Sequence, residues 1–108
     1  MKRKTLKRSS KIVKVVIKPS TKQEKKKMAV FYDNFGNQVK VTHFGAAGMS
    51  DYTKHKDKER KQRYLNRHRK RENWNDFTSA GSLSRWILWG EPTLRASIQQ
   101  YKKRFHLI

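Results

Sequence analysis

The basic residues of this 108-residue chain are concentrated in two blocks, and this concentration limits what the rest of the chain can build. Residues 1–27 contain twelve lysines and arginines against one glutamate, and residues 54–71 contain ten against two acidic residues. The first ten residues offer almost nothing to bury, and if the whole of residues 1–27 is an arm, about eighty residues remain for a hydrophobic core. The sequence therefore predicts one compact domain over residues 28–108, preceded by a basic arm over residues 1–27.

The formal net charge of +20 indicates a polyanionic partner. Like charges at this density repel one another in a folded domain, so they persist where a polyanion neutralises them, and nucleic acid is the commonest polyanion. We therefore expect nucleic acid or acidic proteins as partners, and no small-molecule substrate, cofactor or metal. The chain has no cysteine for disulfides or thiolate sites. Its apolar runs are far shorter than the ~20 residues that cross a bilayer, so no transmembrane segment is expected.

Alternating apolar residues predict a small antiparallel sheet. The β-branched residues of 11–18 alternate with lysines up to Pro19, which predicts an edge strand. Residues 28–33 and 38–44 are β-branched and aromatic, and they flank a turn at 34–37 that contains asparagine and glycine. This pattern predicts a hairpin, in a sheet that is covered on one face and solvated on the other.

Three helices are expected to cover this sheet, which gives an α+β fold. The first is predicted over residues 52–72, where good helix formers follow two possible capping residues, Ser50 and Asp51. The second is predicted over residues 82–90, with a glycine as its C-terminal stop. The third is predicted over residues 92–105, because its apolar side chains recur at helical spacing.

A set of short motifs runs from His43 to Leu94. They are His43-Phe44-Gly45, Ser50-Asp51-Tyr52-Thr53, His55-Lys56-Asp57, Arg63-Tyr64, Arg67-His68, Glu72-Asn73-Trp74, Ala80-Gly81, Leu83-Ser84-Arg85-Trp86-Ile87-Leu88-Trp89 and Pro92-Thr93-Leu94. In combination they resemble a small family of uncharacterised basic proteins encoded by nucleocytoplasmic large DNA viruses, the giant viruses of algae and amoebae. The resemblance implies a viral source and supplies no biochemical activity. It raises two roles, a protein carried on viral DNA and a small component of a capsid.

The basic helix is the strongest candidate for binding nucleic acid. Six of its basic side chains fall within one broad band, and five more lie in the arm: Lys56, Arg60, Arg63, Arg67, Lys70 and Arg71, with Lys2, Arg3, Lys4, Lys7 and Arg8. Contacts of this kind neutralise phosphates without reading sequence. The more specific alternative is that the helix reads bases, for which only Gln62 and Asn66 offer the type of side chain that pairs with adenine. Trp74 and Trp89 are candidates for stacking on bases or for contacting a protein.

Other constellations favour structural roles over chemistry. The histidines of the chain lack the third close ligand that a metal site needs. His43, on a strand face, is typical of a packed or hydrogen-bonded histidine. Helix capping explains Ser50 and Asp51 without a catalytic base. The glycines Gly45 and Gly48 either hold a phosphate on backbone amides or turn the chain from sheet to helix, and the turn is the commoner arrangement. No catalytic residue is expected.

The charge pattern predicts a non-enzymatic protein that binds nucleic acid through phosphate-backbone contacts, and the resemblance implies that it is a virion protein and that the nucleic acid is above all viral DNA. It is expected in the virion and, during infection, in the host nucleus or cytoplasm. The alternative is a minor capsid or scaffold protein whose basic arm threads between capsid subunits. Binding to a membrane surface is disfavoured, because the basic helix lacks the broad apolar face that such helices insert.

Overall fold

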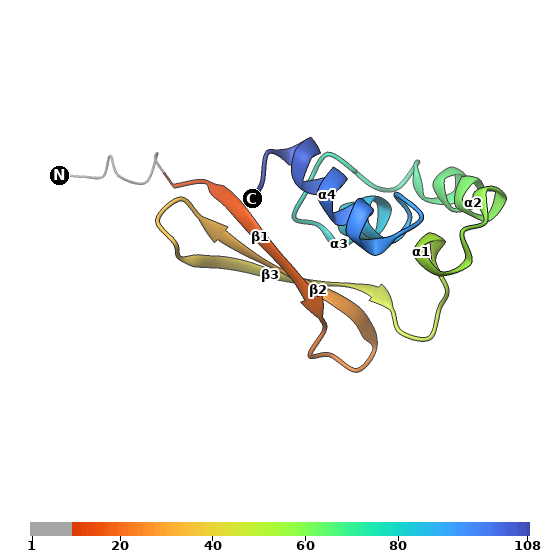
Figure 1. The fold of residues 1–108 in the computed structure, drawn as a ribbon, viewed down its shortest axis with the longest axis horizontal. Coiled ribbons are helices and arrows are strands. Elements are labelled where there is room, and N and C mark those ends of the chain that lie inside the picture. Colours follow the sequence, from red (N-terminus) through yellow and green to blue (C-terminus); the bar gives the residue numbers. More distant parts are fainter. Residues whose placement is uncertain (1–9) are drawn as a thin grey trace.

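The computed structural model describes residues 10–108 and has an α+β fold, in which helices cover one face of a three-stranded antiparallel sheet (Figure 1). The strands are β1 (Ile12–Pro19), β2 (Lys25–Asp33) and β3 (Gln38–Ala46), in the order β1-β2-β3. The predicted class, edge strand and hairpin are confirmed. The compact domain extends further toward the N-terminus than residue 28, because β1 pairs with β2 along its length and Val15 lies in the core.

The two faces of the sheet differ in burial. Val15 of β1 pairs with Phe31 of β2, and both face the helices together with Phe44 of β3. On the opposite face of β3, Val39 and Val41 remain 46% and 38% exposed. The main hydrophobic cluster therefore lies on the side of the sheet where β-branched and aromatic side chains meet the helical layer. On the other face, Val30 of the central strand is also buried, between its pairing partners Val16 and Val41.

The prediction of a single helix over residues 52–72 is wrong. The structure has two helices there, α1 (Tyr52–His55) and α2 (Lys58–His68). Lys56 adopts a left-handed conformation with φ of 55°, which ends α1. Asp57 then caps α2, since its carboxylate accepts hydrogen bonds from the amides of Glu59 and Arg60. The break turns α2 away from α1, and α2 ends at His68, before residue 72.

The helix predicted over residues 82–90 starts earlier, at Ala80, and changes from an α-helix to a π-helical turn along its length. It consists of α3 (Ala80–Leu83), capped by Ser79, and continues as the π-helical turn η2 (Ser84–Leu88). Gly90 follows directly, and a Cβ at this position would lie 2.2 Å from the carbonyl oxygen of Trp86. Only glycine permits this close approach of the backbone to itself.

The last helix is α4 (Leu94–Phe105), and it closes the core over the sheet. Its Tyr101 is fully buried and packs with Ile87 of η2 and Phe31 of β2 in one cluster. The final residue, Ile108, pairs with the outer edge of β1, because its amide donates to the carbonyl of Val13 at 2.9 Å. Within residues 10–108, no helix is long and apolar enough to cross a membrane.

Candidate nucleic-acid interface

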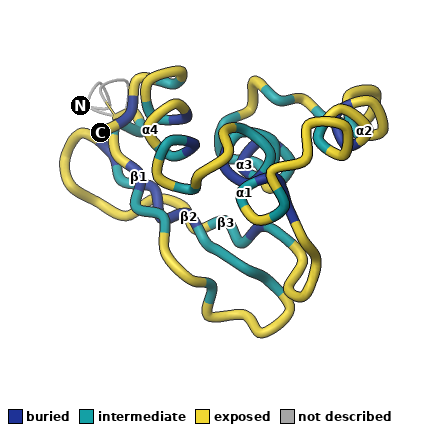
Figure 2. The backbone as a smooth tube through the Cα atoms, turned by 45° about the vertical axis from the view of Figure 1, so that its right-hand side comes forward, coloured by how far each residue is buried: buried dark blue, intermediate teal, exposed yellow. Residues whose placement is uncertain are grey.

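Helix α2 is held at one end of the molecule by a column of stacked rings. The ring of Tyr64 lies parallel to the ring of Trp89, with 4.3 Å between centroids and 4° between planes. His68 stacks on Tyr64 at 4.3 Å. Burial raises the pKa of the Tyr64 phenol. Apart from Tyr64 and Leu65, most of α2 faces solvent, as the predominantly exposed colouring of this helix in Figure 2 shows.

Three arginines of α2 line one shallow hollow, which we call the arginine hollow. Arg60, Arg63 and Arg67 recur at intervals of three and four residues, so they share one side of the helix. The hollow has a volume of about 250 Å³, and its remaining lining comes from Met49, Ser50 and Trp89. The structure therefore brings three predicted binding residues and one predicted tryptophan to a single place.

The charges of these arginines are available to a ligand. Within residues 10–108 the charged contacts are the ion pair of Lys26 with Asp51 and the contact of His68 with Glu72, which is an ion pair only when the imidazole is protonated, and neither involves an arginine of the hollow. The three arginine side chains are exposed. A guanidinium group in this condition can form charge-assisted, bidentate hydrogen bonds with phosphate oxygens.

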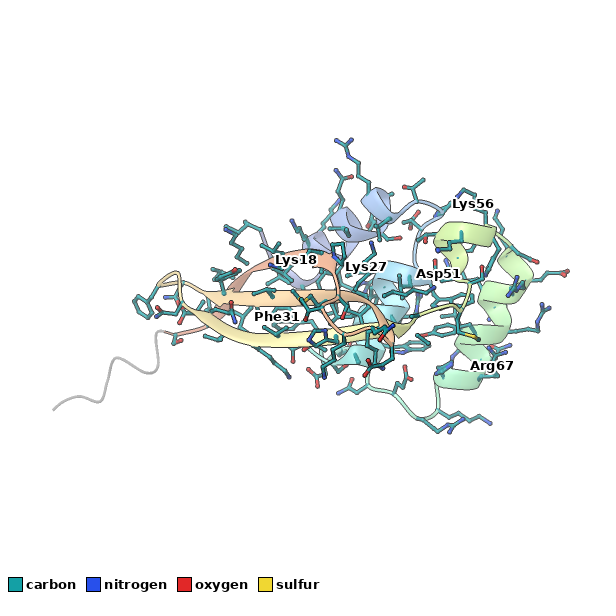
Figure 3. All side chains as sticks on the ribbon, turned by 90° about the horizontal axis from the view of Figure 1, so that it is seen from below. Lys18, Lys27, Phe31, Asp51, Lys56 and Arg67 are labelled. Carbon is teal, nitrogen blue, oxygen red and sulfur yellow. The ribbon has the colours of Figure 1, made fainter. Side chains whose placement is uncertain are left out.

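A larger pocket of about 460 Å³ adjoins the hollow, because both are lined by Met49, Ser50, Arg67 and Trp89. The larger pocket also reaches the buried carboxylate of Asp51. Figure 3 shows Arg67 on α2 and Asp51 between the sheet and this helix. The pocket thus connects the arginines of α2 to the edge of the sheet.

Asp51 is the central polar residue of this region. Its side chain accepts from the amide of Thr53 at 3.0 Å, which confirms the expected capping role, and from Nζ of Lys26 at 2.6 Å. Burial alone would raise the pKa of Asp51, but the hydrogen bonds and positive charge of Lys26 and the hydrogen bonds of Thr53 lower it below 3.8. The positive charge of Lys26 is therefore paired with a carboxylate inside the protein, whereas the arginines of the hollow form no ion pair within residues 10–108.

The other predicted basic residues lie away from the hollow. Lys56 occupies the junction of α1 and α2, where its Nζ donates to the carbonyl of Thr53 at 2.8 Å. Lys70 and Arg71 are exposed in the turn after α2. The predicted arm residues lie outside the described residues: Lys2, Arg3, Lys4, Lys7 and Arg8.

The two predicted stacking tryptophans have partners within the protein. One face of Trp89 is stacked on Tyr64, and the ring of His55 lies 5.2 Å away. Nε1 of Trp74 donates to Glu72 at 3.0 Å, and the guanidinium carbon of Arg85 lies 5.2 Å from the Trp74 ring. Stacking of either tryptophan on a base stays a prediction.

The histidines and glycines have structural roles. Nδ1 of His43 lies 2.7 Å from the hydroxyl of Ser20, so it is hydrogen-bonded as expected for a strand histidine. No group of three or more potential metal ligands occurs in the part of the chain that the structure describes. Gly45 and Gly48 have φ of 81° and 86°, and a Cβ at Gly45 would meet Leu88 at 2.6 Å. Positive φ and close packing against Leu88 account for Gly45, and the positive φ of the turn after β3 accounts for Gly48.

Sequence reasoning missed Met49 and considered Ser50 only as a helix cap, a role that Asp51 has instead; both Met49 and Ser50 line the hollow. Met49 is 65% exposed, and an exposed methionine after the glycine turn was the only local signal. Its position beside α2 depends on the break at Lys56 and on the packing of Trp89. Neither of these follows from the spacing of residues along the chain.

The fold and the hollow define a small basic α+β protein with a cationic helix at one end. Residues 15–68 match the profile of DUF5754, a family of unknown function, and the chain belongs to this family. The match runs from β1 to the end of α2 and contains the three arginines of the hollow. No curated protein and no solved structure matches the chain. The viral source that the motif resemblance implies stays a prediction.

Proposed function

We propose that the protein is a non-enzymatic nucleic-acid-binding protein that contacts the phosphate backbone through the arginine hollow. The observation that carries the proposal is the convergence of Arg60, Arg63 and Arg67 on one hollow, without a carboxylate paired to any of them within residues 10–108. Three such guanidinium groups match successive phosphates of a polymer better than a single small anion. The proposed location is the virion, with viral DNA as the polymer, and the host nucleus or cytoplasm during infection.

Backbone contact is favoured over base readout by the arrangement of the neutral polar residues of α2. Nε2 of Gln62 donates to Oδ1 of Asn66 at 3.0 Å, so these two amides bind one another. Neither amide lines the arginine hollow. A reader of adenine would present such an amide to a base edge beside the arginines. Binding is therefore expected to depend weakly on nucleotide sequence.

A salt titration with a charge-matched control tests the proposal. The variant Arg60→Gln/Arg63→Gln/Arg67→Gln removes the hollow, whereas Lys14→Gln/Lys18→Gln/Lys22→Gln removes the same charge from β1 and the turn after it. Affinity for a fluorescent 20-base-pair duplex is measured by anisotropy between low and moderate salt. For three phosphate contacts, the negative slope of log affinity against log salt should become less steep by about 2.7 in the hollow variant. The control should change the slope far less.

Two results would contradict this function. A flat salt response of the wild-type protein would exclude binding by phosphate neutralisation. Equal losses in the two triple variants would mean that net charge alone attracts the polymer and that the hollow is not its site. Repeating the titration with duplexes of unrelated sequence separates backbone contact, which predicts similar affinities, from readout, which predicts one preferred duplex.

The minor capsid or scaffold role is the second candidate, and one observation favours it. Val39 and Val41 leave an apolar strip on the uncovered face of the sheet, and Phe35 at the hairpin tip is 59% exposed. Exposed apolar strips of this kind suit contact with another protein. Imaging of the protein inside a particle distinguishes the two roles. Acidic protein subunits along residues 1–27, with no nucleic acid beside α2, would favour the capsid role.

A further inference from the structure

A second cationic pocket lies between α2, η2 and α4, and we call it the Trp86 pocket. It has a volume of about 490 Å³ and shares no lining residue with the arginine hollow. Four cations from three helical elements line it, together with one tryptophan and one acidic residue: Lys61, Arg85, Lys103, Arg104, Trp86 and Glu91. The formal net charge of these lining residues is therefore +3.

Arg85 is the most constrained of these cations. Its guanidinium carbon lies 4.1 Å from the centroid of Trp86 and 5.2 Å from that of Trp74, and Nη1 donates to the carbonyl of Trp89 at 3.2 Å. Its Nε is buried without a hydrogen-bond partner among the described residues. The charge is thus partly removed from water, and no carboxylate within residues 10–108 forms an ion pair with it. A desolvated charge without a counter-ion destabilises the protein.

Lys61 and Arg104 place further positive charge beside Arg85. Nζ of Lys61 donates to the carbonyl of Gly90 at 2.7 Å and lies 4.8 Å from the ring of Tyr52. The guanidinium carbon of Arg104 lies 3.9 Å from the centroid of Trp86. Burial and the charge of Arg85 lower the pKa of Lys61, and burial and the charge of Arg104 lower the pKa of Arg85. In Lys61 and Arg85, burial and a neighbouring positive charge therefore both destabilise the charged form.

We propose that the Trp86 pocket binds a phosphate group. A phosphate supplies up to two negative charges and several acceptor oxygens, which suits two arginines and two lysines that converge from separate helices. This inference rests on the proposed function where the phosphate belongs to the nucleic acid, because the polymer then contacts α2 from the side of Lys61 as well as from the hollow. A free phosphate or polyphosphate offers the same chemistry from another source.

Thermal unfolding with a matched variant pair tests the pocket itself. Lys103→Gln/Arg104→Gln removes two lining charges, and Arg95→Gln/Lys102→Gln removes two charges of the same helix that do not line the pocket. Each protein is melted in sodium phosphate and in sodium chloride of equal ionic strength. Phosphate at about ten times its dissociation constant should raise the melting temperature of the wild type and the control by about 5 °C relative to chloride. The pocket variant should lose this rise.

The same variants identify the source of the phosphate. If it belongs to nucleic acid, the pocket variant lowers the salt slope of duplex binding by about one more than the control does. If it is a free phosphate, duplex binding by the two variants is equal while the phosphate-specific rise in melting temperature is still lost. Equal phosphate effects in the two variants, or no phosphate effect in the wild type, would overturn the proposal. A wild type that fails to bind any duplex would sink the proposed function and leave the melting result standing.

Discussion

Asp51 is the residue on which the region between the sheet and α2 depends. A carboxylate that is 2% exposed is stable only when its lost hydration is replaced. Nζ of Lys26 and both the amide and the hydroxyl of Thr53 donate to it, so it joins β2 to the start of α1. Removing the charge leaves Lys26 without a partner in a site where its side chain is only 12% exposed. The pair therefore stabilises the fold that presents the hollow, and it is not a second anion site.

The variant Asp51→Asn is expected to lose about 2–3 kcal/mol of unfolding free energy at pH 7, because it breaks a buried ion pair and leaves Lys26 unpaired. The folded pKa of Asp51 lies below its ordinary value of 3.8. Its stabilising effect is therefore fully present above pH 3.8 and is lost as the pH falls through the folded pKa. Urea unfolding at pH 7 and pH 3 measures both effects.

The difference in stability between wild type and Asp51→Asn should accordingly shrink toward acid pH. Glu59→Gln is a suitable control, since Glu59 is exposed on α2 and its side chain forms no ion pair within residues 10–108. That control should change the unfolding free energy by less than about 0.5 kcal/mol at either pH. Parallel losses of the wild type and Asp51→Asn between pH 7 and pH 3 would show that the carboxylate contributes nothing to acid sensitivity.

At the scale of single elements, the strands follow directly from the sequence, whereas the helix breaks do not. Alternation of apolar residues with a period of two identifies the strands, and Pro19 marks the end of β1 as predicted. Residues 52–72 are rich in helix formers throughout, so propensity alone favours one long helix. The break depends on the left-handed conformation of Lys56 and on the carboxylate of Asp57, which are local choices that helix propensity does not contain.

In the candidate site, likewise, the features local to one helix could be predicted from the sequence, and the contacts between segments could not. The shared side of Arg60, Arg63 and Arg67 follows from helical periodicity. The neighbours of these arginines, Met49 and Trp89, come from segments that only the tertiary fold brings to α2. The Trp86 pocket likewise joins three helices whose relative packing no spacing in the sequence specifies.

Asp57 allows the break between α1 and α2 to be tested. Asp57→Ala should destabilise the protein by about 1 kcal/mol, because the amides of Glu59 and Arg60 lose their acceptor at the start of α2. Asp57→Ser keeps a capping oxygen and should retain most of the stability. Chemical unfolding measures the free energies, and far-ultraviolet circular dichroism checks that helix content is unchanged at low denaturant. Similar losses in the two variants would mean that the cap does not fix this boundary.

At the scale of the whole molecule, positive charge opposes the folded state. The formal net charge is +20, and the described residues contain one ion pair, Lys26 with Asp51, and a second, His68 with Glu72, only when the imidazole is protonated. Favourable pairs are thus few, while repulsion acts between cations on all the described helices and strands except α3. Salt screens exposed charges with a Debye length of about 8 Å at physiological ionic strength, and it weakens buried pairs much less. Because exposed repulsion outweighs paired attraction here, added salt should stabilise the folded state.

Unfolding free energy is expected to rise with ionic strength, by about 1 kcal/mol or more between 50 mM and 500 mM sodium chloride, because screening removes more repulsion than attraction. Urea denaturation at each salt concentration measures the change, since urea itself carries no charge. Sucrose, which favours the folded state without screening, provides a control and should stabilise the wild type and the Lys14→Gln/Lys18→Gln/Lys22→Gln variant equally. Salt should stabilise that less charged variant less than the wild type. Stability that falls with salt would mean that attractive ion pairs dominate the molecule, and the case for a neutralising polyanion would lose its physical basis.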